Sequence, residues 1–256
     1  MVNLFRMDFY RMRKAGSFLV CLILAFLLSL CSTPLMKLLT VLMKLLSDEV
    51  PALPESVKLS ELLASPLSSL NAMLALISVC GFFYADVEHG YIKNIAGQMP
   101  KRGYTILSKF LVSIPHSLIF TLVSLVGDLL GTVFLQRIQV DAGVPDALRI
   151  LFLKLLLLES LCAILLLFTA VLRNKSLGTV FAVLFGLDLM SLVYLAIDAG
   201  LDQLLPKKSF SIAKYMPDQL FHADKPDTVA ALIVSAVVIY LFLWLSVRIF
   251  DKKDVK

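Results

Sequence analysis

The chain has 256 residues, of which 59% are hydrophobic and only 17% are charged, and its mean hydropathy is +0.88. Charged residues make up about 25% of an ordinary soluble domain, so this composition excludes a soluble globular protein. The formal net charge is +5 and the pI is about 9.0. Neither value requires a nucleic-acid partner, because basic residues gathered on one side of a membrane explain both.

Six apolar runs approach the roughly 20 residues with which a helix crosses a bilayer. They are Phe18–Leu35, Leu70–Tyr84, Phe110–Leu135, Ala147–Leu172, Leu177–Ile197 and Thr228–Phe250. No internal repeat or soluble domain interrupts them. The sequence therefore predicts an all-α polytopic membrane protein with six transmembrane helices, which form a single domain over residues 1–256.

A short amphipathic pattern precedes the first run. Phe5, Phe9 and Met12 recur at helical spacing, and basic residues occupy another face. A helix with one apolar and one basic face is typical of a segment that lies in the membrane interface. We therefore expect an N-terminal interfacial helix within residues 1–16.

The first run continues past Pro34 into a leucine-rich stretch that ends near Leu46. Lys37 and Lys44 are seven residues apart, which places them on one face of a helix. This stretch is either a second amphipathic helix on the outer leaflet or an extension of the first span out of the membrane.

Basic residues gather before the first span, between spans two and three, between spans four and five, and after the last span. These segments alternate in topology, and the intervening loops are richer in acidic residues. Because cytoplasmic segments carry the excess of lysine and arginine, we expect both termini to be cytoplasmic. Residues 198–227 then form the largest extracellular loop.

A polar segment between spans two and three, residues 86–104, stands out in this apolar chain. Tyr91, Ile95 and Met99 recur every four residues, which is typical of an amphipathic helix of about three turns. Asp86 and Glu88 would begin this helix, where carboxylates favour the helix dipole. The apolar face either lies on the membrane surface or enters a groove on a partner.

The polar segment resembles the cytoplasmic loop of ABC-2 type transporter permeases, and most of all the small Gram-positive subunits that export peptides and lantibiotics. The resemblance lies in the pattern Asp86-x-Glu88-x-Gly90-x-Ile92-Lys93-Asn94, followed by Lys101-Arg102-x-x-Thr105-x-x-Ser108-Lys109. It implies an exporter fold with a coupling helix at 86–104 that is seated on an ATPase subunit. The residues that the resemblance and the helical pattern assign to this coupling are Asp86, Glu88, Gly90, Tyr91, Ile92, Lys93, Asn94, Lys101 and Arg102.

The resemblance further implies two permease chains per complex, as a homodimer or a heterodimer, with the substrate path between them. It also implies a multi-pass protein of the bacterial plasma membrane that exports amphipathic, antimicrobial or toxin peptides. The chain has no G-x-x-x-x-G-K-[ST] phosphate loop, so ATP and Mg²⁺ would be bound by a separate ATPase subunit. We therefore expect no catalytic residue and no cofactor in this chain.

Three acidic residues lie at membrane depth: Asp128, Glu159 and Asp188. Such groups are costly in hydrocarbon and usually face a cavity or a partner. They are candidates for a translocation path suited to cationic peptides, or they reach a wet end of the bundle. If they bind protons or ions, the chain would be an ATP-independent secondary transporter or channel. A peptide-immunity membrane protein is a further alternative.

Small residues recur four apart in the fifth run, at Gly178, Ala182 and Gly186. This spacing lets two helices approach closely, either within the chain or in a dimer. The four cysteines all lie in apolar runs without C-x-x-C spacing, so neither a disulfide nor a metal site is expected.

Overall fold

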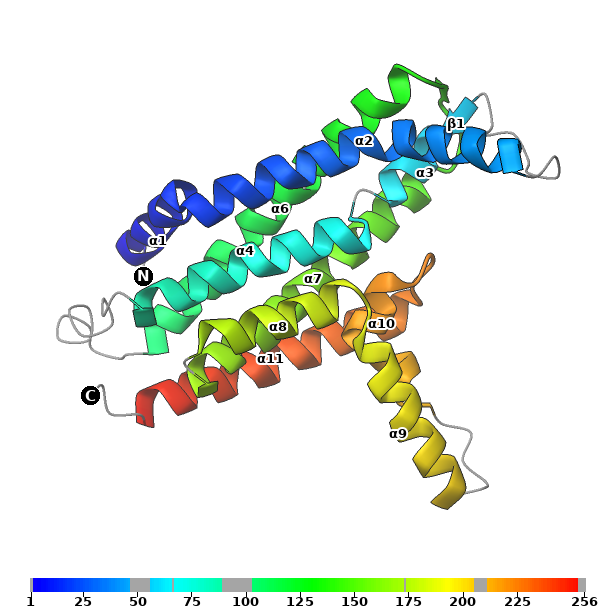
Figure 1. Ribbon diagram of the computed structural model, residues 1–256. Helices are drawn as coiled ribbons and strands as arrows, with labels where there is room; N and C mark the ends of the chain where they lie inside the picture. The colour runs from blue at the N-terminus through cyan, green and yellow to red at the C-terminus, as the bar shows by residue number, and fades with distance from the viewer. Residues whose placement is uncertain are drawn as a thin grey trace.

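The computed structural model describes residues 2–46, 56–65, 67–88, 103–172, 174–204 and 211–252. The long helices lie side by side in one bundle (Figure 1). The helices are α1 (Val2–Lys14), α2 (Gly16–Leu46), α3 (Leu59–Ala64), α4 (Ser69–Glu88), α6 (Gly103–Val133), α7 (Val144–Leu172), α8 (Lys175–Gly186), α9 (Met190–Leu204), α10 (Pro217–His222) and α11 (Thr228–Lys252), with a short 3-10 helix η1 (Ala213–Tyr215). The prediction of a mainly helical chain is confirmed.

Within the described residues, five helical segments are long and apolar enough to cross a membrane, or six if the bent pair α8–α9 counts as one span. The five are Gly16–Lys44, Leu59–Asp86, Gly103–Val133, Val144–Leu172 and Thr228–Asp251. α7 is the most buried of them, because α4, α6, α8 and α11 all contact it. α1 and the last turn of α11 lie at the same end of the bundle, which we call the terminal end (Figure 1).

The fifth predicted span is not a straight helix. α8 and α9 meet at a bend of 75°, and α9 projects away from the bundle (Figure 1). Gly186 allows α8 to end close against α4, since a Cβ there would overlap the backbone of Met73. Asp188 then adopts a φ of 59°, a conformation that commonly ends helices. The expected extracellular loop at 198–227 likewise contains the end of α9, η1 and α10.

The bend is stabilised from α10. The side-chain amide of Gln219 donates to Oδ1 of Asp188, and Nε2 of His222 lies 3.0 Å from the carbonyl oxygen of Phe185. These contacts join residues more than 30 positions apart in the chain. The bend is therefore a tertiary feature, which the apolar pattern of the run does not encode.

The leucine-rich stretch after Pro34 is an extension of the first span, because α2 is continuous through Pro34 to Leu46. Thr33 Oγ1 lies 3.2 Å from Thr132 Oγ1, next to the last residue of α6. From Thr33 to Leu46 there are about 13 residues, so α2 continues roughly 20 Å beyond the end of α6. Large apolar side chains on this extension are exposed.

Small residues allow α2 and α6 to pack closely. A Cβ at Gly127 would lie 2.8 Å from Cβ of Ser29, and one at Gly131 would overlap the carbonyl oxygen of Leu30. The Ser32 hydroxyl also donates to Asp128 across this contact, at 3.2 Å. Gly127 and Gly131 are four residues apart, the same spacing of small residues that is found in α8.

The small-residue face of α8 packs on α4 within the chain. A Cβ at Gly178 would overlap the ring of Tyr84, and Ala182 is fully buried. Gly186 of α8 likewise approaches Met73 of α4. Since α4 occupies this face, we do not propose it as a dimer contact.

A pair of short strands joins two connections at the end opposite to the terminal end. β1 (Ser56–Lys58) and β2 (Arg137–Gln139) pair in parallel, with Val57 opposite Ile138. The carboxylate of Asp141 accepts from the backbone N–H of Ser60 at 3.1 Å and from its hydroxyl at 2.7 Å. The Ser60 hydroxyl bond lowers the pKa of Asp141. The apolar pattern of the sequence does not predict these strands.

Candidate functional site

Most of the predicted coupling helix lies outside the described residues, because α4 ends at Glu88 and the description resumes at Gly103. The predicted coupling residues in this gap are Gly90, Tyr91, Ile92, Lys93, Asn94, Lys101 and Arg102. The structure does describe the helix ends on both sides of the gap. They lie at the terminal end of the bundle (Figure 1).

Asp86 and Glu88 do not begin a new helix as predicted. Both belong to the last turn of α4, which has no proline or glycine between Tyr84 and Glu88 to end it earlier. A carboxylate in the last turn is disfavoured by the helix dipole. Asp86 is nevertheless stable there because two cations from other helices pair with it.

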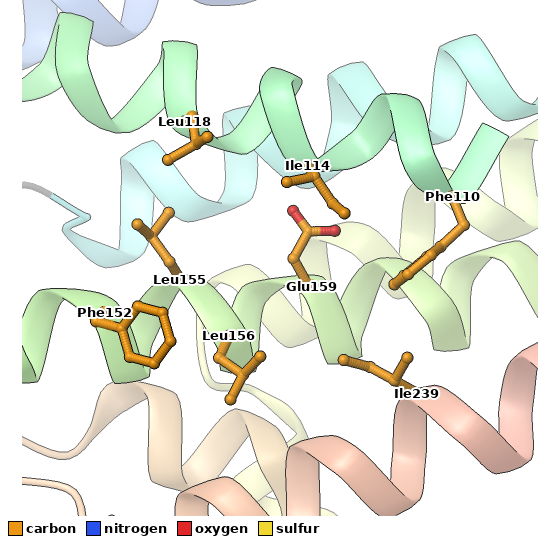
Figure 2. A pocket seen from close by; sticks show the side chains of 8 residues that line it. All are labelled: Phe110, Ile114, Leu118, Phe152, Leu155, Leu156, Glu159 and Ile239. Carbon is orange, nitrogen blue, oxygen red and sulfur yellow. The ribbon is translucent and has the colours of Figure 1, made fainter. Parts of the chain in front are cut away.

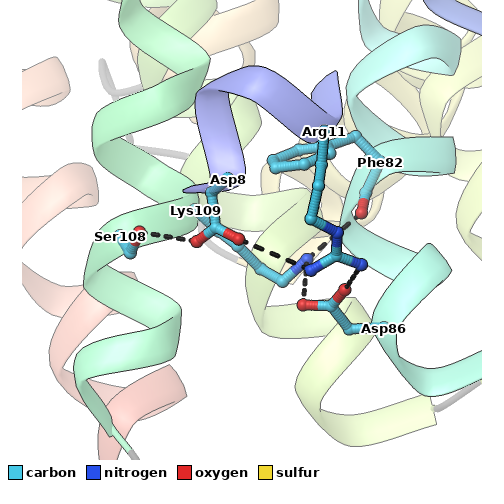
Figure 3. A network of polar contacts seen from close by, with 6 residues as sticks. All are labelled: Asp8, Arg11, Phe82, Asp86, Ser108 and Lys109. Atoms are coloured by element: carbon cyan, nitrogen blue, oxygen red, sulfur yellow. Dashed lines mark hydrogen bonds and ion pairs between the residues drawn. The ribbon is translucent and has the colours of Figure 1, made fainter. Parts of the chain in front are cut away.

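These charges form a cluster of four ionisable side chains: Asp8, Arg11, Asp86 and Lys109 (Figure 3). The guanidinium of Arg11 donates to Oδ1 of Asp86, and Lys109 Nζ lies 3.0 Å from its Oδ2. Arg11 also lies 3.6 Å from the carboxylate of Asp8. The Ser108 hydroxyl donates to the other oxygen of Asp8 at 2.6 Å. We call these five residues the charged cluster.

The charged cluster is largely removed from water. Asp8 is 2% exposed, Asp86 3% and Lys109 5%, whereas the Arg11 side chain is 24% exposed. Two carboxylates face two cations, so the formal charges balance. Burial raises the pKa of Asp8, and the Ser108 hydrogen bond and the charge of Lys109 offset this rise only in part. Arg11 is the member that reaches toward solvent.

Lys109 has partners beyond Asp86. Its ammonium donates to the carbonyl oxygen of Phe82 at 3.1 Å and lies 4.5 Å from the centre of the Phe82 ring. An ammonium group has three N–H donors, and here they meet a carboxylate, a carbonyl and an aromatic face. Lys109 is thus held on α4 although its own backbone belongs to α6.

The charged cluster joins three elements, because its members come from α1, α4 and α6. α1 presents Leu4, Asp8 and Met12 as one buried stripe, at the i, i+4 and i+8 positions. On the other side of the gap, the backbone N–H of Gly103 donates to Asp251 of α11 at 2.8 Å. Both helix ends that border residues 89–102 are therefore fixed to the bundle.

The sequence pattern predicts no role for Asp8, and Ser108 and Lys109 have only their place in the pattern after Arg102. One signal was present: Asp8 is the only acidic residue before Asp48, within an otherwise basic segment. It lies four residues from Met12 on the apolar stripe of the predicted interfacial helix. An acid at that position indicates a cation packed against it.

Each of the three predicted intramembrane acids has a different hydrogen-bond partner. Asp128 accepts from Ser32 between α6 and α2, Glu159 accepts from Ser113 between α7 and α6, and Asp188 accepts from Gln219 at the bend. Across the part of the chain that the structure describes, no hydrogen bond or ion pair joins any two of them. Their place on a translocation path stays a prediction.

The charged cluster links helices and presents no reactive side chain. Its charges are satisfied by one another, so no member is poised as a nucleophile or a free general base. Among the described residues, no group of three or more His, Cys, Asp or Glu side chains could hold a metal ion. The arrangement joins α1, α4 and α6 through ion pairs and a hydrogen bond.

No family model matches the chain, and no curated protein matches it.

Proposed function

We propose that this chain is the membrane permease subunit of an ATP-binding-cassette exporter. In this proposal it spans the plasma membrane, associates with a second permease chain, and depends on a separate ATPase subunit that binds ATP and Mg²⁺. Its substrates are amphipathic or antimicrobial peptides moved outward. The proposal is supported by the several long apolar helices and by the resemblance of residues 86–109 to ABC-2 permease loops.

The observation that carries the proposal is the charged cluster beside residues 89–102. A loop that merely connects two spans does not need buried ion pairs, whose desolvation is costly. Here Asp86 is the first residue of the polar segment, and Lys109 follows its last residue closely. A force applied to the polar segment would therefore act on α1, α4 and α6 as one unit.

The mechanism that follows is alternating access. ATP binding brings two ATPase subunits together, and each presses on the polar segment of one permease chain. Because the charged cluster holds the end of α4 and the start of α6, this motion tilts the membrane-spanning helices rather than deforming residues 89–102. The substrate passes between the two permease chains, and the chain itself makes and breaks no covalent bond.

The first experiment is purification of the chain from its native membranes in mild detergent, followed by identification of its partners and assay of ATP hydrolysis. We expect an ATPase subunit with a phosphate loop to co-purify. Ile92→Ala and Glu88→Ala should each lower substrate-stimulated ATP hydrolysis, since both residues lie in the proposed coupling segment. Leu42→Ala and Glu61→Ala, at the opposite end of the bundle, are the matched controls.

Two outcomes would contradict the proposal. One is unchanged coupling in both Ile92→Ala and Glu88→Ala. The other is transport that needs no ATP and stops when a protonophore collapses the proton gradient. The second outcome would identify a secondary transporter instead.

A further inference from the structure

A pocket with charged walls lies where α7 and α11 begin. Its volume is about 270 Å³. Asp146 and Arg149 of α7 and Thr228 of α11 line it, together with Lys225 from the link between α10 and α11. The three charged side chains belong to exposed residues, so a ligand can reach them. Figure 2 shows a contrasting groove between α6, α7 and α11, whose lining is apolar apart from the buried Glu159.

The pocket lies at the depth of lipid head groups. α7 and α11 both begin at the end of the bundle opposite to the terminal end (Figure 1). The 29 residues of α7 rise about 43 Å, whereas the hydrocarbon core of a bilayer is about 30 Å thick. A core that ends near Leu172 therefore begins near Leu153, about 20 residues earlier. Asp146 and Arg149 then lie one to two turns beyond the hydrocarbon.

The charges in the pocket do not neutralise one another. Asp146 and Arg149 are three residues apart on α7, a spacing at which they could pair. Instead, Nη2 of Arg149 donates to the Thr228 hydroxyl of α11 at 2.6 Å. Every ion pair in the described part of the chain belongs to the charged cluster, which contains none of these residues. The pocket therefore presents two cations and one carboxylate that are not paired with each other.

These groups fit a ligand that carries both a phosphate and a primary ammonium. A guanidinium has five N–H donors, of which Thr228 takes one, so others remain for a phosphate. The positive dipole ends of α7 and α11 also favour an anion here. A carboxylate such as that of Asp146 accepts hydrogen bonds from an ammonium. Leu153 and Pro226, both buried, line the pocket with apolar surface that suits the carbons between these groups.

We propose that this pocket binds the phosphoethanolamine head group of a membrane lipid. Arg149 and Lys225 donate to the phosphate, and the ammonium of the head group donates to Asp146. The volume is slightly below the roughly 300–1,000 Å³ of drug-sized ligand sites, which suits a head group rather than a folded peptide. The site needs no ATPase partner, so it goes beyond the proposed function and does not depend on it.

The test is native mass spectrometry of the full chain in detergent, titrated with three lipids that share dioleoyl chains. These are phosphatidylethanolamine, phosphatidylcholine and phosphatidylglycerol. We expect phosphatidylethanolamine to bind several-fold more tightly than either of the others, because choline has no N–H donor and glycerol carries no positive charge. Free phosphoethanolamine at the same concentration should not displace it, because the soluble compound lacks the acyl chains.

Variants separate the two halves of the head group. Arg149→Gln removes a phosphate contact that the ethanolamine and choline lipids share, so it should weaken both by about tenfold. Asp146→Asn should instead lower the affinity for phosphatidylethanolamine to that for phosphatidylcholine. Lys37→Gln is the matched control, because Lys37 is an exposed cation of α2 that does not line the pocket.

Equal affinity of the wild-type chain for the three lipids would overturn the proposal, and this comparison needs no variant. Tighter binding of phosphatidylglycerol would also overturn it and show an anionic site. Displacement by free phosphoethanolamine at equal concentration would identify a soluble phosphate compound as the ligand instead of a lipid. A preference for phosphatidylethanolamine that survives in Asp146→Asn would contradict the assigned ammonium contact.

Discussion

At the scale of single residues, Asp86 is the centre of the charged cluster because both Arg11 and Lys109 pair with it. Asp86→Asn would leave the ammonium of Lys109 buried without a charged partner. Removing one partner of a buried ion pair costs about 3–5 kcal/mol. We therefore expect Asp86→Asn to lower the free energy of unfolding by about that amount, measured as a reduced Tm in detergent.

Asp8→Asn is the matched control at the same cluster. Asparagine can still accept from the Ser108 hydroxyl, and burial already favours the neutral form of Asp8 by raising its pKa. The folded chain thus binds the carboxyl proton of Asp8 more tightly than the unfolded chain does. The contribution of Asp8 to stability therefore falls as the pH rises from the ordinary pKa of an aspartate through the raised pKa of the folded chain. Asp8→Asn should remove that fall and lower the Tm less than Asp86→Asn, because Arg11 and Lys109 keep the carboxylate of Asp86 as their partner. Equal losses of Tm in the two variants would contradict this description of the cluster.

At the scale of secondary-structure elements, the contact between α2 and α6 depends on Gly131. A Cβ at this position meets a backbone oxygen of α2, which cannot rotate away as a side chain can. Gly131→Ala should therefore separate the two helices, break the Ser32–Asp128 hydrogen bond, and cost about 1–3 kcal/mol as overpacked sites do. The measurement is again the unfolding of the purified chain in detergent.

Gly200→Ala in α9 is the control, because nothing lies within 4 Å of a Cβ there. It should be neutral or slightly stabilising, since alanine favours a helix over glycine. If Gly131→Ala were tolerated as well as Gly200→Ala, close packing would not hold α2 against α6.

The same helices show which features of the fold can be predicted from the sequence. Long apolar runs predict most of the helices that could span a membrane, because membrane depth dictates their length. The bend at Asp188 escapes prediction, since Gln219 and His222 of α10 stabilise it from a distance in sequence. The helical pattern assigns Asp86 to the wrong helix for a related reason, since its partner Arg11 is 75 residues away in the chain. Periodicity reports which face of a helix is apolar, not which distant side chain meets it.

At the scale of the whole molecule, the charged cluster lies at the terminal end of the bundle, and the bend between α8 and α9 lies away from it (Figure 1). In the proposed exporter, the terminal end faces the ATPase and the opposite end faces outward. The central claim is that the polar segment following Asp86 touches that ATPase directly.

The most direct measurement is photo-crosslinking in native membranes, with a photoreactive amino acid placed at position 92 and, as a control, at position 42. The account predicts a protein adduct from position 92 that contains an ATPase subunit with a phosphate loop, and none from position 42. Adducts from position 92 that contain only lipid, under conditions in which the chain still supports transport, would contradict it.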